Sequence, residues 1–517
     1  MRDSKPDRLL APPPMTETLR ASYDEFPYES APVAHSHPDR LATLGRLFGL
    51  TPPPIERCRV LEIGCSSGGN LIPMAEMLPQ SEFTGIDFSA VQIDRAMADA
   101  SALGLANVRL LQMDVREFDD ALGSFDYIIA HGVYSWVPDE VQERLLEICA
   151  RHLAPDGIAY VSYNTLPGWA LPGVVRDAML YHARQFSDPK MRVQQARAVL
   201  DFLAETLQDS ASAYGTMLAE EAQYIRRQPD FYIFHEHLEQ VNSAVYFHQF
   251  MERATRHGLR YLAEAELRSM LPGDLPAEAR QTLDRVAKDL MLREQLMDFL
   301  RNRRFRRTLL VHEAAPLTRK LSPERIFALQ VATRATPSSE VPDERSTASE
   351  EFRSPDGGRL TTQRPLTKAA MMVLIEHSPQ AIAFDELCGL AGTRLGAPAV
   401  VAADQKAALA SDLLQCFSGG VVELHSAASP LVIRAGERPR TSAVARLQAG
   451  RGARVANLRH EPVDLHEDAR RLVSLLDGTR SREALAALVL PADRDGTAPA
   501  RLQTGLSQLA RLALLVG

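Results

Sequence analysis

Short apolar runs alternate with amphipathic stretches between residues 58 and 163, and this alternation predicts a parallel sheet covered by helices. Each run is short enough to be a buried strand, and helical segments fill the gaps between them. This alternation is typical of a doubly wound, Rossmann-like α/β fold with helices on both faces of the sheet. The five runs are CRVLEIGC (58–65), SEFTGIDF (81–88), VRLLQMDV (108–115), FDYIIAHG (125–132) and GIAYVSYN (157–164).

The strand pattern stops near residue 172, and the remaining chain divides into further parts. Residues 174–330 carry long amphipathic stretches such as MRVQQARAVLDFLAETL, which predict an all-α middle domain. Two later segments each combine three short helical stretches with a final strand-like one, as in winged-helix modules. The predicted domains are 1–172, 173–332, a polar linker at 333–358 without apolar periodicity, 359–430 and 431–517.

Composition and charge narrow the class of protein. The 517 residues include 58 basic and 66 acidic side chains, which gives a net charge of −8. A dedicated binder of nucleic acid or of an anionic membrane would be basic overall, so the charge argues against both classes. Five scattered cysteines without a CxxC motif support neither a disulfide framework nor a zinc site. The N-terminus lacks the apolar core of a signal peptide. We therefore expect a cytoplasmic protein without a metal, nucleic-acid or membrane partner.

The segment VLEIGCSSGGN (60–70) carries the most specific chemistry. It is a buried strand that runs into a glycine-rich turn and then a helix, and glycine lets such a turn approach a ligand closely. The next strand ends at Asp87, 19 residues after Gly68, where a carboxylate can accept hydrogen bonds from a ribose diol. The pattern predicts a nucleotide-type cofactor at this edge of the sheet.

The order Glu62-x-Gly64-x-Ser66-x-Gly68 resembles the first motif of class I S-adenosylmethionine-dependent methyltransferases, with Ser66 at the usual middle glycine. The resemblance implies S-adenosyl-L-methionine as cofactor. Glu62 would support its methionine end, Asp87 its ribose and Asp114 its adenine amino group, with Phe88 and Met113 beside the adenine ring. The cofactor-binding set is Glu62, Gly64, Ser66, Gly68, Asp87, Phe88, Met113, Asp114, Val115 and His131.

Further segments resemble bacterial methyltransferases that carry a methyltransferase regulatory domain. These are YDEFPYES, HPDRLATLGRLFGL, FDYIIAHGVYSWVP and YVSYNTLPGW, followed by FHEHLE and FLRNRRFRRTLL in the regulatory part. Rickettsial-type protein-lysine methyltransferases, which modify outer-membrane proteins, share this architecture and end in a winged helix that LDGTRSREAL resembles. The resemblance implies N-methylation of lysine in a protein partner, such as an outer-membrane protein before export.

The turn after the fourth strand is expected to lie beside the reacting methyl group. A DNA amino-methyltransferase would carry Asn/Asp-Pro-Pro-Tyr there, but this chain has HGVYSWVP (131–138), so that class is excluded. Aromatic faces stabilise the cation that forms when an amine is methylated. The predicted catalytic set is His131, Tyr134, Trp136 and Tyr163, with His131 either taking a proton or ordering the backbone. A structural cap on the cofactor pocket is an equally open interpretation of these residues.

Other features leave alternatives open. His235 and His237 are two apart on a predicted helix, so they point to different faces, and a satisfied helix surface is favoured over a metal site. Apolar faces of the middle helices suit a homodimer or intramolecular packing equally well. The alternatives to a protein-lysine methyltransferase are a small-molecule O- or N-methyltransferase and a non-catalytic module that binds the cofactor.

Overall fold

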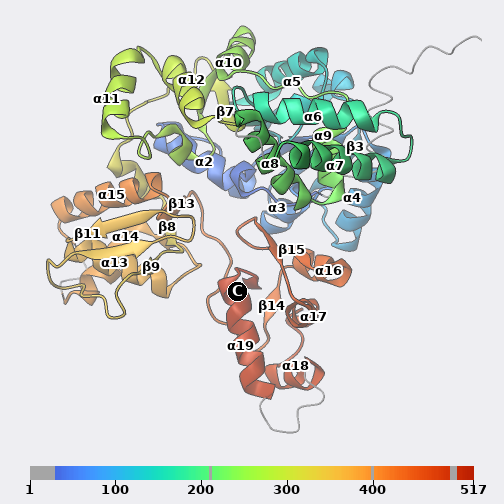
Figure 1. The fold of residues 1–517 in the computed structure, drawn as a ribbon. Coiled ribbons are helices and arrows are strands. Elements are labelled where there is room, and N and C mark those ends of the chain that lie inside the picture. The colour runs from blue at the N-terminus through green and yellow to red at the C-terminus, as the bar shows by residue number, and fades with distance from the viewer. Residues whose placement is uncertain (1–29, 209–211, 397–400, 490–497) are drawn as a thin grey trace, which may run out of the picture.

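A seven-stranded sheet forms the centre of the larger part of the molecule (Figure 1). The computed structural model describes residues 30–208, 212–396, 401–489 and 498–517. The strand order is β3-β2-β1-β4-β5-β7-β6, with β1 to β5 parallel to one another and β7 antiparallel to both β5 and β6. The five predicted strands and the Rossmann-like fold are confirmed. The strands are β1 (Arg59–Ile63), β2 (Glu82–Asp87), β3 (Val108–Gln112), β4 (Phe125–Ala130), β5 (Leu153–Asn164), β6 (Leu259–Glu264) and β7 (Phe305–His312).

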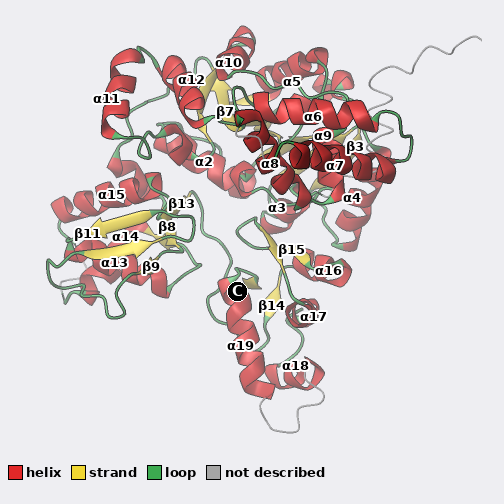
Figure 2. Ribbon diagram, in the orientation of Figure 1, coloured by secondary structure: helices red, strands yellow, loops and turns green. Residues whose placement is uncertain are grey.

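Helices cover both faces of this sheet (Figure 2), and polar side chains cap the N-termini of two of them. Ser89 caps α4 by accepting a hydrogen bond from the Gln92 amide, and His37 caps α2 in the same way at the Asp39 amide. The apolar side of α2 is fully buried against the sheet. These helices are α2 (Pro38–Leu47), α3 (Leu71–Met77), α4 (Ala90–Ala102) and α5 (Asp139–His152).

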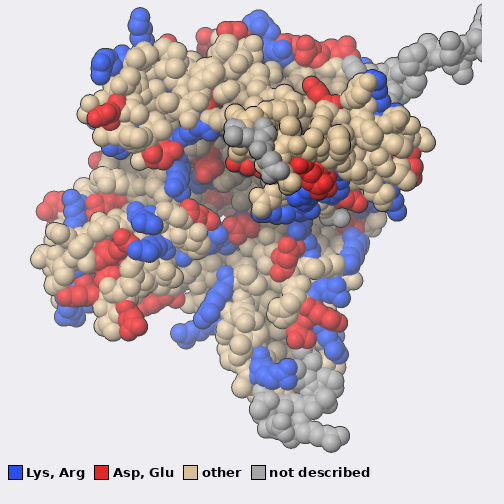
Figure 3. All heavy atoms as spheres, in the orientation of Figure 1, with Lys and Arg blue, Asp and Glu red and all other residues tan. Residues whose placement is uncertain are grey.

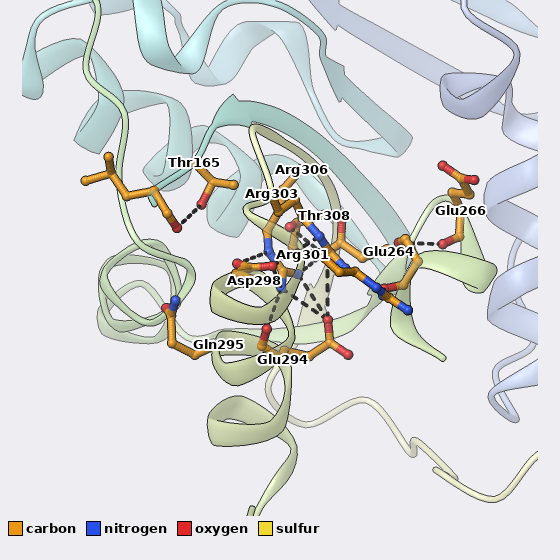
Figure 4. Close-up of polar contacts among 12 residues, drawn as sticks. Thr165, Glu264, Glu266, Glu294, Gln295, Asp298, Arg301, Arg303, Arg306 and Thr308 are labelled. Atoms are coloured by element: carbon orange, nitrogen blue, oxygen red, sulfur yellow. Dashed lines mark hydrogen bonds and ion pairs between the residues drawn. The ribbon is translucent and has the colours of Figure 1, made fainter. Parts of the chain in front are cut away.

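The expectation of an all-α middle region is wrong at β6 and β7, which complete the sheet. The sequence FRRTLLVH looks like a continuation of the preceding helix because its arginines suggest a solvated face. Arg306 instead points inward, is fully buried, and pairs with carboxylates of β6 and α12 (Leu290–Arg301) (Figure 4). Its guanidinium lies 2.6 Å from Glu264, 2.8 Å from Asp298 and 3.2 Å from Glu294. Arg303 also pairs with Asp298 at 3.1 Å, so three buried carboxylates share two guanidinium groups.

The rest of the middle region is helical, as predicted. Four helices pack around a core of their own, which includes Val175, Leu200 and Ile225. They are α6 (Ala170–Ala183), α7 (Pro189–Thr206), α8 (Ala213–Arg226) and α9 (Asp230–His237). Of two further helices, α10 (Phe247–Arg256) packs on β6 and α12, and α11 (Ala277–Val286) packs on α12, beside which both are seen in Figure 1.

The linker predicted at 333–358 is structured. Within it lie strands β9 and β10, and the segment between them is held by a buried lysine rather than by an apolar pattern. The Lys368 ammonium donates to the carbonyls of Asp343, Ser346 and Ala348 at 2.5–3.1 Å. Because such a contact leaves no periodicity, the sequence gives no sign of it. The elements of this module are β8 (Gln330–Thr333), β9 (Thr336–Pro337), β10 (Glu350–Arg353), β11 (Arg359–Thr362), α13 (Pro365–Glu376), β12 (Ile382–Ala383), α14 (Phe384–Arg394), α15 (Ala403–Ser418) and β13 (Val422–His425).

A last module of four helices and short strands docks on the helices of the large sheet. The Glu76 carboxylate of α3 accepts from the Ala443 and Val444 amides at the start of α16, and Arg451 pairs with Asp99 at 2.6 Å. The domain boundaries themselves stay predictions. The elements are β14 (Arg440–Thr441), α16 (Ala443–Arg451), β15 (Arg454–Ala456), β16 (Pro462–Asp464), α17 (Glu467–Leu475), α18 (Arg482–Val489), α19 (Ala498–Arg511) and β17 (Leu515–Val516).

Basic and acidic side chains are interspersed over the face of the molecule shown in Figure 3. Among the described residues, no helix is both long and apolar enough to cross a membrane.

Candidate active site

A cavity of about 650 Å³ lies where the parallel strands of the large sheet end. The loops after β1, β2, β3 and β4 supply one part of its wall, as expected for a ligand site in an α/β fold. Gly68, Tyr134 and Tyr163 of the predicted site do not line it. The predicted residues that line it are Glu62, Gly64, Ser66, Asp87, Phe88, Met113, Asp114, Val115, His131 and Trp136.

The glycine-rich loop after β1 takes left-handed backbone conformations at Gly64 (φ +73°) and Gly68 (φ +77°). A Cβ added at Gly64 would lie 2.4 Å from Val133 Cγ2, so glycine is required there. Ser66 adopts φ +50° although it carries a side chain, a left-handed conformation that glycine adopts more readily. The Ser66 amide donates to Asp87 Oδ2 at 2.9 Å and thereby fastens the loop to the end of β2.

Glu62 is buried at the end of β1 with one of its two oxygens satisfied. Its Oε1 accepts from Asn70 Nδ2 at 2.7 Å, whereas Oε2 has no hydrogen-bond partner among the described residues. Burial, and to a lesser degree Asp87, raises the pKa of Glu62 to about 8. A buried acceptor without a partner is costly, and a bound group that donates hydrogen bonds would remove this cost. The ammonium of a methionine-type cofactor fits this position.

Asn70 is held in turn by a residue of the C-terminal module that the sequence did not reveal. His460 Nε2 lies 2.7 Å from Asn70 Oδ1, and Val33 donates its amide to the same oxygen at 2.8 Å. Burial, together with His37, lowers the pKa of His460 well below its usual range, so its ring is neutral and donates one N–H. The backbone at His460 is left-handed, with φ +57°. No motif signal could have found it, because it lies 390 positions from Asn70 in the chain.

The other two acids of the cofactor set are also engaged locally. Asp87 accepts from the Ser66 and Ser89 amides, both at 2.9 Å. The hydrogen bonds from Arg116, one of them 2.6 Å long, hold the pKa of Asp114 below its usual range, so this carboxylate is ionised at neutral pH. Both carboxylates therefore remain hydrogen-bond acceptors at the cavity wall.

His131 and Trp136 lie on the cavity wall after β4. His131 Nδ1 is 3.0 Å from the Tyr160 hydroxyl and 3.2 Å from Ser162 Oγ. Burial, together with the charge of Arg307, lowers the pKa of His131 to about 4, which favours the ordering role over that of a proton acceptor at pH 7. Trp136 is 7% exposed, and its ring centroid is 6.4 Å from that of Trp169 in an edge-to-face arrangement.

The catalytic role predicted for Tyr134 and Tyr163 does not fit their positions. Both are fully buried and pack on Phe250 of α10, with ring centroids 5.2 Å and 4.1 Å from it. The Tyr163 hydroxyl lies 3.1 Å from Thr308 Oγ1 on β7. Their partners come from α10 and β7, and the sequence did not show that these two elements pack against the strand ends. They lie behind the cavity wall and do not line the cavity.

The remaining wall comes from helices of the middle region and from β7. His235 and His237 are each only 3% exposed and line the cavity with Glu236, so the expected satisfied helix surface is wrong. Within the part of the chain that the structure describes, no group of three metal-ligating side chains is found. Of the segment YDEFPYES only Ser30 is described, and it lines the cavity too. The middle-region and β7 lining residues are Trp169, Pro172, Glu221, Tyr224, Tyr232, His235, Glu236, His237, Arg304, Phe305 and Arg307.

Three family models match this chain. One described as a methyltransferase domain matches residues 60–157, which hold the glycine-rich loop and the three strand-end acids. The description "Predicted methyltransferase regulatory domain" belongs to a match over residues 229–312. The third, "PKMT, C-terminal winged helix domain", matches residues 437–513.

Rickettsial proteins match most of the chain. An uncharacterized protein of Rickettsia prowazekii is 35% identical over 478 residues, which cover 90% of this chain and 85% of the relative. The solved structure of PKMT2 from Rickettsia typhi has a TM-score of 0.84 at 30% identity and covers 95% of this chain and 100% of its own. The same figures hold for its complex with AdoHcy.

The orphaned Glu62 oxygen, the left-handed glycine loop and these matches agree on one cofactor and one activity. The protein is an enzyme that uses S-adenosyl-L-methionine, and the chain belongs to the family of S-adenosylmethionine-dependent methyltransferases that combine a regulatory domain with a PKMT-type C-terminal winged helix.

Proposed function

We propose that this methyltransferase N-methylates lysine side chains of a protein substrate. The observation that carries the proposal is that one cavity joins two kinds of wall. The cofactor residues Glu62 and Asp87 line this cavity, and so do the aromatic rings of Trp136 and Trp169 and the carboxylate of Glu236. An aromatic and anionic wall suits an acceptor that is cationic before and after methylation. The similar solved structure of PKMT2 supports the same choice.

The chain's own residues contribute binding, orientation and exclusion of water. When bound, S-adenosylmethionine supplies a methyl group already activated by a sulfonium leaving group. Glu62 and Asp87 would hold the two ends of this cofactor, while Trp136 and Trp169 would shield the acceptor from solvent. A lysine amine must lose its proton before it can attack, and an apolar aromatic surrounding lowers the pKa of the ammonium.

The partner that fits the proposal is an outer-membrane protein that is methylated in the cytoplasm before its export.

We also propose that two copies of the chain form a dimer through α6, α7 and α8. Light scattering on the purified protein measures this oligomeric state. Phe202→Asp is expected to yield the monomer, because it places a charge on the paired face. Seven large apolar side chains of these helices are 40–67% exposed, namely Leu171, Val174, Tyr181, Met191, Phe202, Tyr214 and Tyr224.

The direct test is to incubate the protein with methyl-labelled cofactor and a bacterial extract. We expect label in protein, recovered as methylated lysine after acid hydrolysis, and no label with the Asp87→Ala variant. Label that enters only small molecules, or another amino acid, would support the small-molecule alternative or a different acceptor. A chain that binds the cofactor and labels nothing would contradict lysine methylation.

A further inference from the structure

Among the described residues, the charged side chains that the middle region and β7 contribute to the cavity wall each have an ion-pair partner of opposite charge, with the exception of Glu236. Arg304 pairs with Glu221, and Arg307 lies 3.7 Å from Glu266. Glu236 lines the same wall, yet it makes no hydrogen bond or ion pair within the described part of the chain. The two arginines are therefore already matched, and one carboxylate is left without a cation.

Aromatic side chains share the cavity wall with Glu236. Tyr232 precedes Glu236 by four residues on α9, so the two lie on the same face of that helix. The edge-to-face pair of Trp136 and Trp169 adds two further rings from the turn after β4 and the start of α6. Such a wall offers apolar surface for an alkyl chain and a negative charge for its end.

We infer that Glu236 is the binding group for a cationic primary amine at the end of an unbranched alkyl chain, the chemistry of a lysine side chain. The inference rests on the proposed function and names the residue that selects its substrate class. An ammonium at Glu236 would form a charge-assisted hydrogen bond, while the methylene groups lie along the aromatic rings. Its proton can pass along this hydrogen bond to the carboxylate, which leaves the neutral amine that attacks the methyl group. A neutral acceptor of the same shape would leave this carboxylate without a partner.

The pKa of the Glu236 carboxyl group in the free protein agrees with a binding site for a cation. Burial raises the pKa of Glu236 to about 7, and no nearby positive charge offsets this effect. His237, next to it, also has a buried Nδ1 without a hydrogen-bond partner in the described part of the chain. A cationic ligand favours the ionised carboxylate, so binding compensates the cost of burying it.

Intrinsic fluorescence gives a direct test, because the protein has two tryptophans and both line this cavity. The full chain is titrated with n-butylamine, which reproduces the end of a lysine side chain, and in parallel with 1-butanol, its neutral counterpart, at constant ionic strength. We expect a saturable change with the amine alone. Glu236→Gln should weaken amine binding roughly ten- to hundredfold, because a charge-assisted hydrogen bond is lost.

Two control variants separate charge from shape and from folding. Glu220→Gln makes the same change on an exposed residue of α8 outside the cavity and should bind the amine like the unaltered protein. Glu236→Asp keeps the charge and should retain part of the affinity. Equal binding of n-butylamine by Glu236→Gln and the unaltered protein, or no saturable change in the unaltered protein, would overturn the inference.

The labelled-extract experiment distinguishes failure of this inference from failure of the proposed function. If Glu236→Gln binds n-butylamine normally while methylated lysine still forms, Glu236 is not the binding group and lysine methylation stands. If the amine binds through Glu236 while the extract yields no methylated lysine, the amine site stands and a small cationic amine replaces the protein acceptor.

Discussion

At the scale of single residues, Asp87 links the cofactor site to the loop that builds it. Its two carboxylate oxygens accept the amides of Ser66 and Ser89, one in the glycine-rich loop and one at the start of α4. Removal of this side chain therefore loses the ribose acceptor and also frees the loop.

Asp87→Ala is expected to lower affinity for the cofactor by one to two decades, because each charge-assisted hydrogen bond contributes roughly 1.5–3 kcal/mol. Calorimetric titration with S-adenosylhomocysteine measures this loss. Asp94→Ala removes an exposed carboxylate of α4 that does not line the cavity and should leave the affinity unchanged. Unchanged affinity in a folded Asp87→Ala protein would place the cofactor elsewhere.

Trp136→Ala should reduce the rate of methyl transfer more than it reduces cofactor affinity. Loss of one cation–π contact of ~0.5–2 kcal/mol predicts a drop of up to about thirtyfold. Initial rates of protein labelling and calorimetry on the same variant measure the two effects separately. A folded variant that labels protein at the original rate would mean that the acceptor does not contact this ring.

Sequence reasoning places residues at the cavity wall where a strand end precedes them, and it fails where a partner comes from far along the chain. Glu62, Asp87 and Asp114 follow from the strand ends that precede them. Tyr134 and Tyr163 were expected beside the methyl group, but Phe250, more than eighty residues later, covers them. Aromatic residues at a strand end look the same whether they face a cavity or a helix, and their chain neighbours do not decide between the two.

At the scale of elements, the largest difference between prediction and structure lies at β6 and β7, which the sequence predicts as part of an all-α region. Arg306 of β7 is buried and pairs with Glu264 of β6 and with two carboxylates of α12. A charged residue at a buried position masks the alternation of apolar and polar residues that predicts a strand. The guanidinium of Arg306 also lies 3.9 Å from the Phe247 ring centroid. A single buried arginine thus joins two strands and two helices.

Arg306→Met is expected to lower the free energy of unfolding by about 3–5 kcal/mol, because it leaves the buried Glu264 carboxylate without its ion-pair partner. Urea denaturation at pH 7 measures the change. Arg293→Met on the same α12 helix breaks a more exposed pair with Asp284 and should cost less than about 1 kcal/mol. Equal effects of the two substitutions would show that the cluster does not stabilise the fold.

At the scale of the whole molecule, the winged-helix module contacts a residue that lines the cavity. His460 reaches Asn70, Asn70 reaches Glu62, and Glu62 faces the cavity. These hydrogen bonds join the last module to the first strand, so a module without a cofactor motif holds a side chain of the cavity wall in place. His460 acts here as a positioning residue.

His460→Ala is expected to weaken cofactor binding by up to about tenfold, since a net hydrogen bond contributes roughly 0.5–1.5 kcal/mol. Alanine keeps a Cβ at the left-handed position, so the backbone cost there does not change. His466→Ala removes the cap of α17 in the same module without touching Asn70 and serves as control. Equal calorimetric affinities for the two variants would contradict the positioning role.

The contact between His460 and Asn70 has a consequence for biosynthesis. During translation the N-terminal strands emerge from the ribosome first and begin to fold before the rest of the chain exists. A nascent chain can therefore form the glycine-rich loop early, but Asn70 receives its partner only after 390 further residues have been made. Ribosome-bound or prematurely terminated chains should capture the cofactor less well than finished ones, which ties methyl transfer to completed synthesis of the enzyme.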